Sequence, residues 1–105
     1  MAEDRISQLK EILTVNPADS FARYALAMEY SNSGQVDTAV AEFKTLLHHN
    51  PNYVNAYFMA AQALAGAQRN QEAIDLLRDG IATAQRTNNR HAESEMQELL
   101  NSIEN

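Results

Sequence analysis

The chain has 105 residues, no cysteine and a formal net charge of −6, a composition that suits one domain and excludes a disulfide-bonded scaffold. The sequence contains eight Lys and Arg residues and fourteen Asp and Glu residues, and the two halves of the chain have equal numbers of each kind. Because a nucleic-acid binder needs a basic stripe to neutralise phosphates, nucleic acid is not an expected partner.

The N-terminal segment, MAEDRISQLKEIL, is acidic and amphipathic, whereas a signal peptide would be basic and then apolar. No apolar run along the chain is long enough to cross a bilayer. Three Gly and two Pro are few against the abundant helix formers Ala, Leu, Gln and Glu. The composition therefore predicts an all-α, soluble, cytoplasmic protein without membrane contact.

Helical periodicity divides the chain into six segments. The first has its apolar residues on one stripe, at Ile6, Leu9, Ile12 and Leu13. The pairs Asn16-Pro17 and Asn50-Pro51 are interpreted as helix starts, with the asparagine as N-cap and the proline as first helical residue. The predicted helices are residues 3–15, 17–32, 36–49, 51–67, 70–86 and 89–103.

Shifting the sequence by 34 residues brings similar residues into register, which indicates an internal repeat. The matches include Ala22 with Ala56, Tyr24 with Phe58, Ala27 with Ala61, Ala39 with Ala73, Phe43 with Leu77, and Asn16-Pro17 with Asn50-Pro51. Each repeat unit contains two predicted helices. The first segment matches the second helix of a unit whose first helix is missing.

This period and its residue pattern resemble the tetratricopeptide repeat, W-x2-L-G-x2-Y followed by A-x3-F and then P. The first unit matches at Leu26, Ala27, Tyr30, Ala39, Phe43 and Pro51, and the second at Tyr57, Ala60, Ala61, Leu64, Ala73 and Leu77. The departures are Arg23 in place of an aromatic residue, Gln68 in place of the turn residue Gly34, and Gln85 in place of the proline.

The resemblance implies a right-handed α-solenoid of antiparallel helix pairs in one domain. Its parts would be a half-unit at 1–16, repeats at 17–50 and 51–86, and a capping helix at 88–105. The alanines Ala27, Ala39, Ala61 and Ala73 would be the points where the paired helices approach most closely. The last segment breaks the period by about one residue but keeps an apolar stripe, as a cap requires, at Ala92, Met96, Leu99, Leu100 and Ile103.

No set of residues with the spacing of a catalytic, metal or cofactor site is apparent. His48 and His49 are adjacent on a helix and point about 100° apart, so they cannot chelate one ion as an i, i+4 pair does. Their place at a helix C-terminus favours a structural role, and the isolated His91 is interpreted in the same way. We therefore expect a protein that is not an enzyme and holds no metal or cofactor.

A second apolar stripe, formed by Phe21, Tyr24 and Met28, lies across the helix axis from the core residues Leu26 and Tyr30. The resemblance places this stripe in the concave groove where relatives bind peptides, and the matching residues of the next unit are Asn55, Phe58 and Gln62. In some relatives Lys and Asn hold a peptide's terminal carboxylate there; Tyr24 and Met28 stand in their place here, so that mode is not expected.

These six residues are the predicted binding site for a peptide or partner protein, with apolar area for affinity and amides for the peptide backbone. One alternative is that Phe21, Tyr24 and Met28 pack on the N-terminal helix or on a second copy of the chain. The protein would then be a self-associating assembly module, a possible homo-oligomer. A chaperone-like adaptor for unfolded segments is the second alternative.

Overall fold

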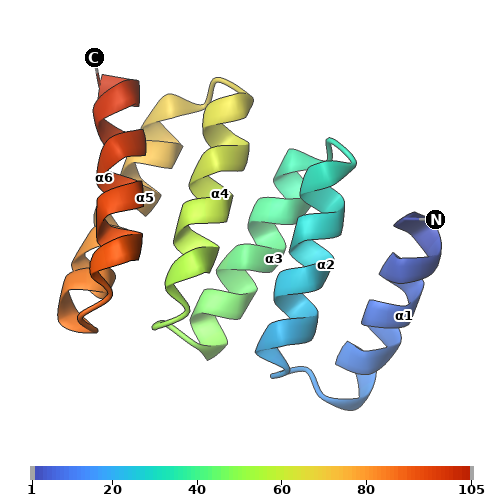
Figure 1. Cartoon of the computed structure of the whole chain (residues 1–105). Coiled ribbons are helices and arrows are strands. Elements are labelled where there is room, and N and C mark those ends of the chain that lie inside the picture. The colour runs from blue at the N-terminus through green and yellow to red at the C-terminus, as the bar shows by residue number, and fades with distance from the viewer. Residues whose placement is uncertain (1, 105) are drawn as a thin grey trace.

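The computed structural model describes the backbone of residues 2–104, with side chains from Glu3 onward. This part of the chain contains no strand. Its six helices are α1 (Ala2–Val15), α2 (Ser20–Asn32), α3 (Val36–His49), α4 (Val54–Gly66), α5 (Asn70–Arg86) and α6 (Arg90–Glu104). They stand side by side in chain order and form a row whose extents are 40 × 28 × 18 Å (Figure 1). The predicted all-α fold is confirmed.

Helices α2 and α4 begin three residues later than predicted, because each Asn-Pro pair forms a turn instead of a helix start. The C=O of Asn16 accepts from the N–H of Asp19 at 3.1 Å, and the C=O of Asn50 accepts in the same way from Tyr53. Asp19 is the N-cap of α2, since its Oδ1 accepts from the N–H of Ala22 at 3.0 Å. The predicted N-cap roles of Asn16 and Asn50 are therefore wrong.

The side chain of Asn16 is used within the turn. Its Oδ1 accepts from the N–H of Ala18 at 3.3 Å, which is the local bond of an Asx-turn. Asparagine suits both an N-cap and such a turn, and here the carboxylate of Asp19 satisfies the first turn of the helix instead. A charged acceptor at a helix N-terminus also interacts favourably with the helix dipole.

Every helix packs against its neighbours in the chain, and contacts also join α2 to α4 and α4 to α6. Within residues 2–104 no such contact joins α1 to α3 or α3 to α5. In a curved stack, elements approach each other most closely on the inside of the curve. Helices α2, α4 and α6 therefore line the concave side of the row, and α1, α3 and α5 lie on the outer side.

The core is closed by small residues at the predicted points of close approach. Ala27, Ala39, Ala61 and Ala73 are all 0% exposed, as the sequence predicts. Larger buried side chains fill the remaining space, namely Phe43, Leu46, Leu64, Leu77 and Met96. One buried cluster extends over α1 to α4 and a second over α3 to α6, so the core runs along the whole row.

Three turns share one backbone geometry, with a residue in the left-handed region at each: Gly34 (φ 79°), Gln68 (φ 64°) and Asn88 (φ 58°). The N–H of the next residue donates to the carbonyl five residues back, as from Gln35 to Tyr30 at 2.9 Å. The first two turns lie within a repeat unit, whereas the third joins α5 to α6. The α5–α6 connection therefore repeats the turn inside a unit, not the Asn-Pro turn between units.

The length of α5 explains this difference. Gln85 occupies the place that Pro51 has one unit earlier, and without a proline α5 continues through Arg86. It has 17 residues where α3 has 14. The register of α6 is therefore shifted by two residues relative to α4, not by about one as predicted. The matching buried positions are Ala56 with Ala92, Ala60 with Met96, and Leu64 with Leu100.

Candidate functional site

The six predicted site residues lie on α2 and α4, the two adjacent helices of the concave side, and we call them the inner face. Phe21 is 76% exposed, which makes it the most exposed aromatic side chain among the described residues. Asn55 and Gln62 are exposed, whereas Tyr24, Met28 and Phe58 are half-buried. No pocket is found on the part of the chain that the structure describes.

Tyr24 joins the inner face to the core. Its ring meets the edge of Phe43 on α3, with centroids 5.9 Å apart, and lies 5.3 Å from the ring of Tyr53 in the turn before α4. Burial, and secondarily the neighbouring Tyr53, raises the pKa of the Tyr24 phenol above its ordinary value near 10. Tyr24 also packs against the buried cluster that includes Leu13 of α1, so the first helix contributes to the core beneath this part of the inner face.

Met28 and Phe58 are anchored in the same way. Met28 packs against the buried cluster of α1 to α4, and Phe58 packs against the cluster of α3 to α6. Each is partly buried and leaves the rest of its side chain accessible. Tyr24, Met28 and Phe58 are therefore held by the core below them, which lowers the entropy that these side chains lose when a partner binds.

The inner face over α2 and α4 carries no free charge. Helix α4 contains no charged residue. The charged residues of α2 are both paired: Nη1 of Arg23 lies 2.7 Å from Oε1 of Glu42, and Nε of Arg5 lies 2.6 Å from Oε1 of Glu29. Neither helix therefore offers an unpaired cation to a carboxylate.

The pair of Arg23 with Glu42 is a feature that the sequence analysis missed. Nη2 of Arg23 also donates to the C=O of Pro17 at 3.0 Å. One unit later, Oη of Tyr57 donates to the C=O of Pro51 at 3.1 Å. Arg23 thus makes the bond that the aromatic residue makes in the second unit, which explains the departure from the repeat pattern.

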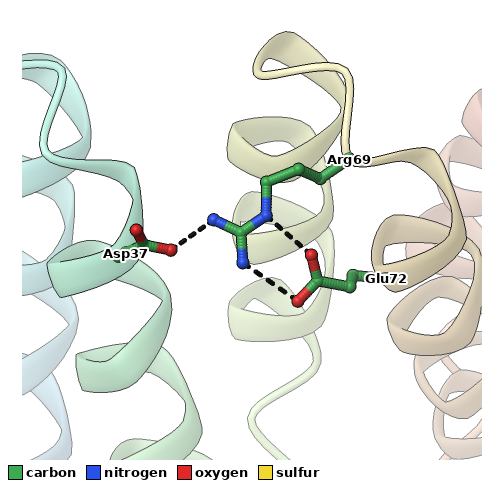
Figure 2. A network of polar contacts seen from close by, with 3 residues as sticks. All are labelled: Asp37, Arg69 and Glu72. Atoms are coloured by element: carbon green, nitrogen blue, oxygen red, sulfur yellow. Dashed lines mark hydrogen bonds and ion pairs between the residues drawn. The ribbon is translucent and has the colours of Figure 1, made fainter.

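An ion-pair network lies at the turns, on the side of the outer helices (Figure 2). Arg69 donates to both carboxylate oxygens of Glu72, at 2.6 and 3.0 Å, and also to Asp37 at the start of α3. The guanidinium lowers the pKa of the Glu72 carboxyl below its ordinary value. The network links α3 to α5, two helices whose backbones are not in contact.

The histidines are on the surface. His48 and His49 are exposed, with their rings edge to face and 5.8 Å apart, and Nε2 of His91 lies 3.3 Å from Oε1 of Glu95. No group of three or more His, Cys, Asp or Glu in the described chain is placed to hold a metal ion. Over the same residues, no helix has the length and hydropathy needed to span a membrane.

Helix α6 extends the inner face beyond the residues that the sequence analysis named. With its register shifted by two, the counterparts of Asn55, Phe58 and Gln62 are His91, Ser94 and Glu98. All three are exposed. The 34-residue period could not identify them, because the shift depends on how far α5 continues past the missing proline.

Two-helix units stacked in chain order, with their first helices on the concave side, define an α-solenoid of helical repeats. A family profile described as tetratricopeptide repeat matches residues 24–89. The chain belongs to the tetratricopeptide repeat family. The match covers most of the first unit and all of the second, and it confirms the resemblance seen in the sequence.

Solved structures agree with this assignment. A tetratricopeptide repeat domain protein from Salinibacter ruber is 31% identical, with a TM-score of 0.77 over 85% of this chain and 90% of that one. The TPR2B domain of yeast Sti1, solved as a complex with pHsp70, is 19% identical, with a TM-score of 0.86 over 94% of this chain and 79% of that one. No curated protein sequence matches the chain.

The Yersinia enterocolitica type III secretion translocator chaperone SycD, solved as an alternative dimer, is similar in fold. It is 17% identical, with a TM-score of 0.88 over 98% of this chain and 79% of that one. At this identity, as for Sti1, the similarity concerns the fold alone.

Proposed function

We propose that this chain is a non-catalytic protein–protein interaction module that binds a peptide or partner protein on its inner face. The observation that carries the proposal is the exposure of Phe21, a large aromatic residue on a concave helix whose side chain is 76% exposed. It lies on the same face of the helix as Tyr24 and Met28. Aromatic and Met side chains are enriched at protein interfaces, where burying them supplies much of the affinity.

The relatives support this proposal. The TPR2B domain of Sti1 was solved bound to pHsp70, and YrrB, another solved relative with 22% identity, is described as having an unusual peptide-binding site. The exposed amides of Asn55 and Gln62 suit the same role, because they can pair with the backbone of a bound peptide. The inner face would thus combine apolar anchors with polar groups that fix orientation.

The experiment that tests the proposal compares Phe21→Ser with Val15→Ser in affinity purification from cells that express the protein naturally. Both side chains are highly exposed, at 76% and 87%, so neither change should alter stability by more than about 0.5 kcal/mol. Val15 lies on the outer helix α1 and is the matched control. We expect Phe21→Ser to lose the partner and Val15→Ser to keep it.

Two results would count against the proposal. Retention of the partner by Phe21→Ser would place binding elsewhere, and loss by both variants would indicate a general effect of removing surface apolar area. Circular dichroism spectra of both variants establish that the helices remain formed.

Self-association is a second candidate function, favoured by apolar residues at the end of α1. Ile12 and Val15 are 45% and 87% exposed, and α1 contacts no other helix than α2 among the described residues. SycD is described as a dimer, which supports this alternative. Sedimentation across protein concentration tests it: a dimer that Val15→Ser dissociates and Phe21→Ser leaves intact would favour assembly through α1.

A further inference from the structure

The inner face continues onto α6, and its chemistry changes along the way. Three successive concave helices match in their buried residues, so their exposed residues also occupy matching positions. The set on α2 is apolar, with Phe21, Tyr24 and Met28. The set on α4 holds one aromatic and two amides, and the set on α6, His91, Ser94 and Glu98, contains no apolar side chain.

Negative charge appears only at the α6 end of this surface. Glu98 is exposed and forms no ion pair within the described chain. Glu95 is the counterpart of Met59 in the shifted register, and its one ion pair among the described residues is with the exposed His91, at 3.3 Å. The other acidic residues of α6 are directed elsewhere, since Glu93 accepts from Gln85 and Glu104 pairs with Arg78.

We propose that the partner of the inner face is a segment with apolar side chains at one end and lysine or arginine at the other. The apolar end would lie over α2 and the basic end over Glu95 and Glu98 of α6. This inference rests on the proposed function and specifies the chemistry of the partner. It follows from charge complementarity, because the α2 and α4 part of the face is neutral and its α6 part is acidic.

The spacing of the two ends follows from helix packing. Neighbouring helices of the concave side are in direct contact, so their axes lie about 10 Å apart and three of them span about 20 Å. An extended peptide rises about 3.3 Å per residue, so about six residues separate the apolar anchor from the basic group. Between them, Asn55 and Gln62 of α4 are exposed and can pair with the peptide backbone.

A random peptide library of about twelve residues, twice this span, tests the inference when selected on the immobilised protein. We expect enrichment of Phe, Leu or Met together with Lys or Arg about six positions away. The same selection on a Glu95→Gln, Glu98→Gln double variant should keep the apolar enrichment and lose the basic one. The matched control is Glu3→Gln, Glu11→Gln, two exposed glutamates of the outer helix α1.

The outcomes separate this inference from the proposed function. Selected peptides that are apolar but carry no basic preference, or an acidic one, would overturn the inference and leave the binding function standing. A basic preference that persists in the Glu95, Glu98 variant would also overturn it. No enrichment over a blank surface would overturn the proposed function itself, and the inference with it.

Affinity measurements on one selected peptide sharpen the result. Replacing a single Lys or Arg by Gln should weaken binding about two- to fivefold, the range for an exposed ion pair. This difference should disappear at about 1 M salt, where the Debye length falls to about 3 Å. A salt-independent difference would show that the basic side chain contributes through packing and would count against pairing with α6.

Discussion

The two repeat units use different side chains to donate a hydrogen bond to equivalent proline carbonyls. In the unit of α2 and α3, Arg23 donates to Pro17 at 3.0 Å, and in the unit of α4 and α5, Tyr57 donates to Pro51 at 3.1 Å. Arginine brings a charge that tyrosine does not, and Glu42 neutralises it at 2.7 Å. The comparison teaches that this repeat position is defined by the hydrogen bond that its side chain makes. Where the side chain is charged, as in Arg23, a second residue of opposite charge is also required.

The units also differ where the second helix of each meets its neighbours. Leu46 in the first unit is 1% exposed, and its counterpart in the second unit is the buried Gly80. A Cβ atom at Gly80 would lie 2.6 Å from Sδ of Met96 and 2.7 Å from Cβ of Tyr57. At Gly80, side chains from α4 and α6 thus occupy the space that the side chain of Leu46 fills at the equivalent position of the first unit.

The largest expected effect comes from emptying the first of these positions. Leu46→Ala should destabilise the protein by about 2–5 kcal/mol, because a fully buried side chain is lost and the packed helices cannot collapse completely. Chemical denaturation measures the change. A loss below 1 kcal/mol would show that Leu46 does not fill the space between the units.

Filling the second position should also destabilise the protein. We expect Gly80→Ala to cost about 1–3 kcal/mol through overpacking against Tyr57 and Met96, although alanine is the better helix former. Gly66→Ala is the matched control, since nothing lies within 4 Å of its added Cβ, and it should be neutral or slightly stabilising. Equal stability of the two variants would contradict the close packing at Gly80.

Arg23 and Glu42 of the first unit correspond to Tyr57 and Leu76 of the second. This difference can be tested by placing the second unit's residue types at the two positions of the first unit. Glu42→Leu alone should cost about 1–2 kcal/mol, because Arg23, whose side chain is 15% exposed, loses its charged partner. Adding Arg23→Tyr should recover most of this loss. A double-mutant cycle measures the coupling, and strict additivity would mean that the two positions do not depend on each other.

A smaller difference is expected at the turns. Gly34 and Gln68 both have positive φ, a conformation that strains a residue with a side chain. Gln68→Gly should therefore stabilise the protein by about 0.5–1 kcal/mol, and Gly34→Gln should destabilise it by a similar amount. Thermal melts of the two variants provide the measurement, and shifts of the same sign would show that backbone strain does not decide the preference.

The smallest effect concerns pH and the network that joins the units. Arg69 lowers the pKa of Glu72 in the folded chain, so between that value and the ordinary value near 4.5 the unfolded chain binds more protons. The contribution is present above pH 4.5 and is lost as the pH falls through the folded value. The difference in melting temperature between the parent and Glu72→Gln should vanish at acidic pH; a pH-independent difference would refute the linkage.

Much of the fold could be predicted because its determinants are local and repeat. The alanines at close approach recur at 34 residues, and four helices were placed within one residue of their observed bounds. The start of α2 could not be placed, since Asn16 suits a cap and an Asx-turn equally, and the choice depends on Asp19. The shift of α6 depends on where α5 stops, which periodicity does not specify.

The candidate site could be predicted only as a helix face. Periodicity places Phe21, Tyr24 and Met28 on one stripe, but the burial of Tyr24 depends on the rings of Phe43 and Tyr53, which come from other segments. The pair of Arg23 with Glu42 left a detectable signal, because both positions change together between the units. That the inner face binds a partner stays a prediction.

Because each helix packs mainly on its neighbours, the chain should open in stages when it fluctuates at equilibrium. Helix α1 contacts α2 alone within residues 2–104, so detaching it breaks one interface. Helix α4 contacts four others and can be exposed to solvent only when most of the row has separated. Amide hydrogens of α1 should therefore exchange with solvent first and those of α4 last, which makes the concave centre the most slowly opening part of the molecule.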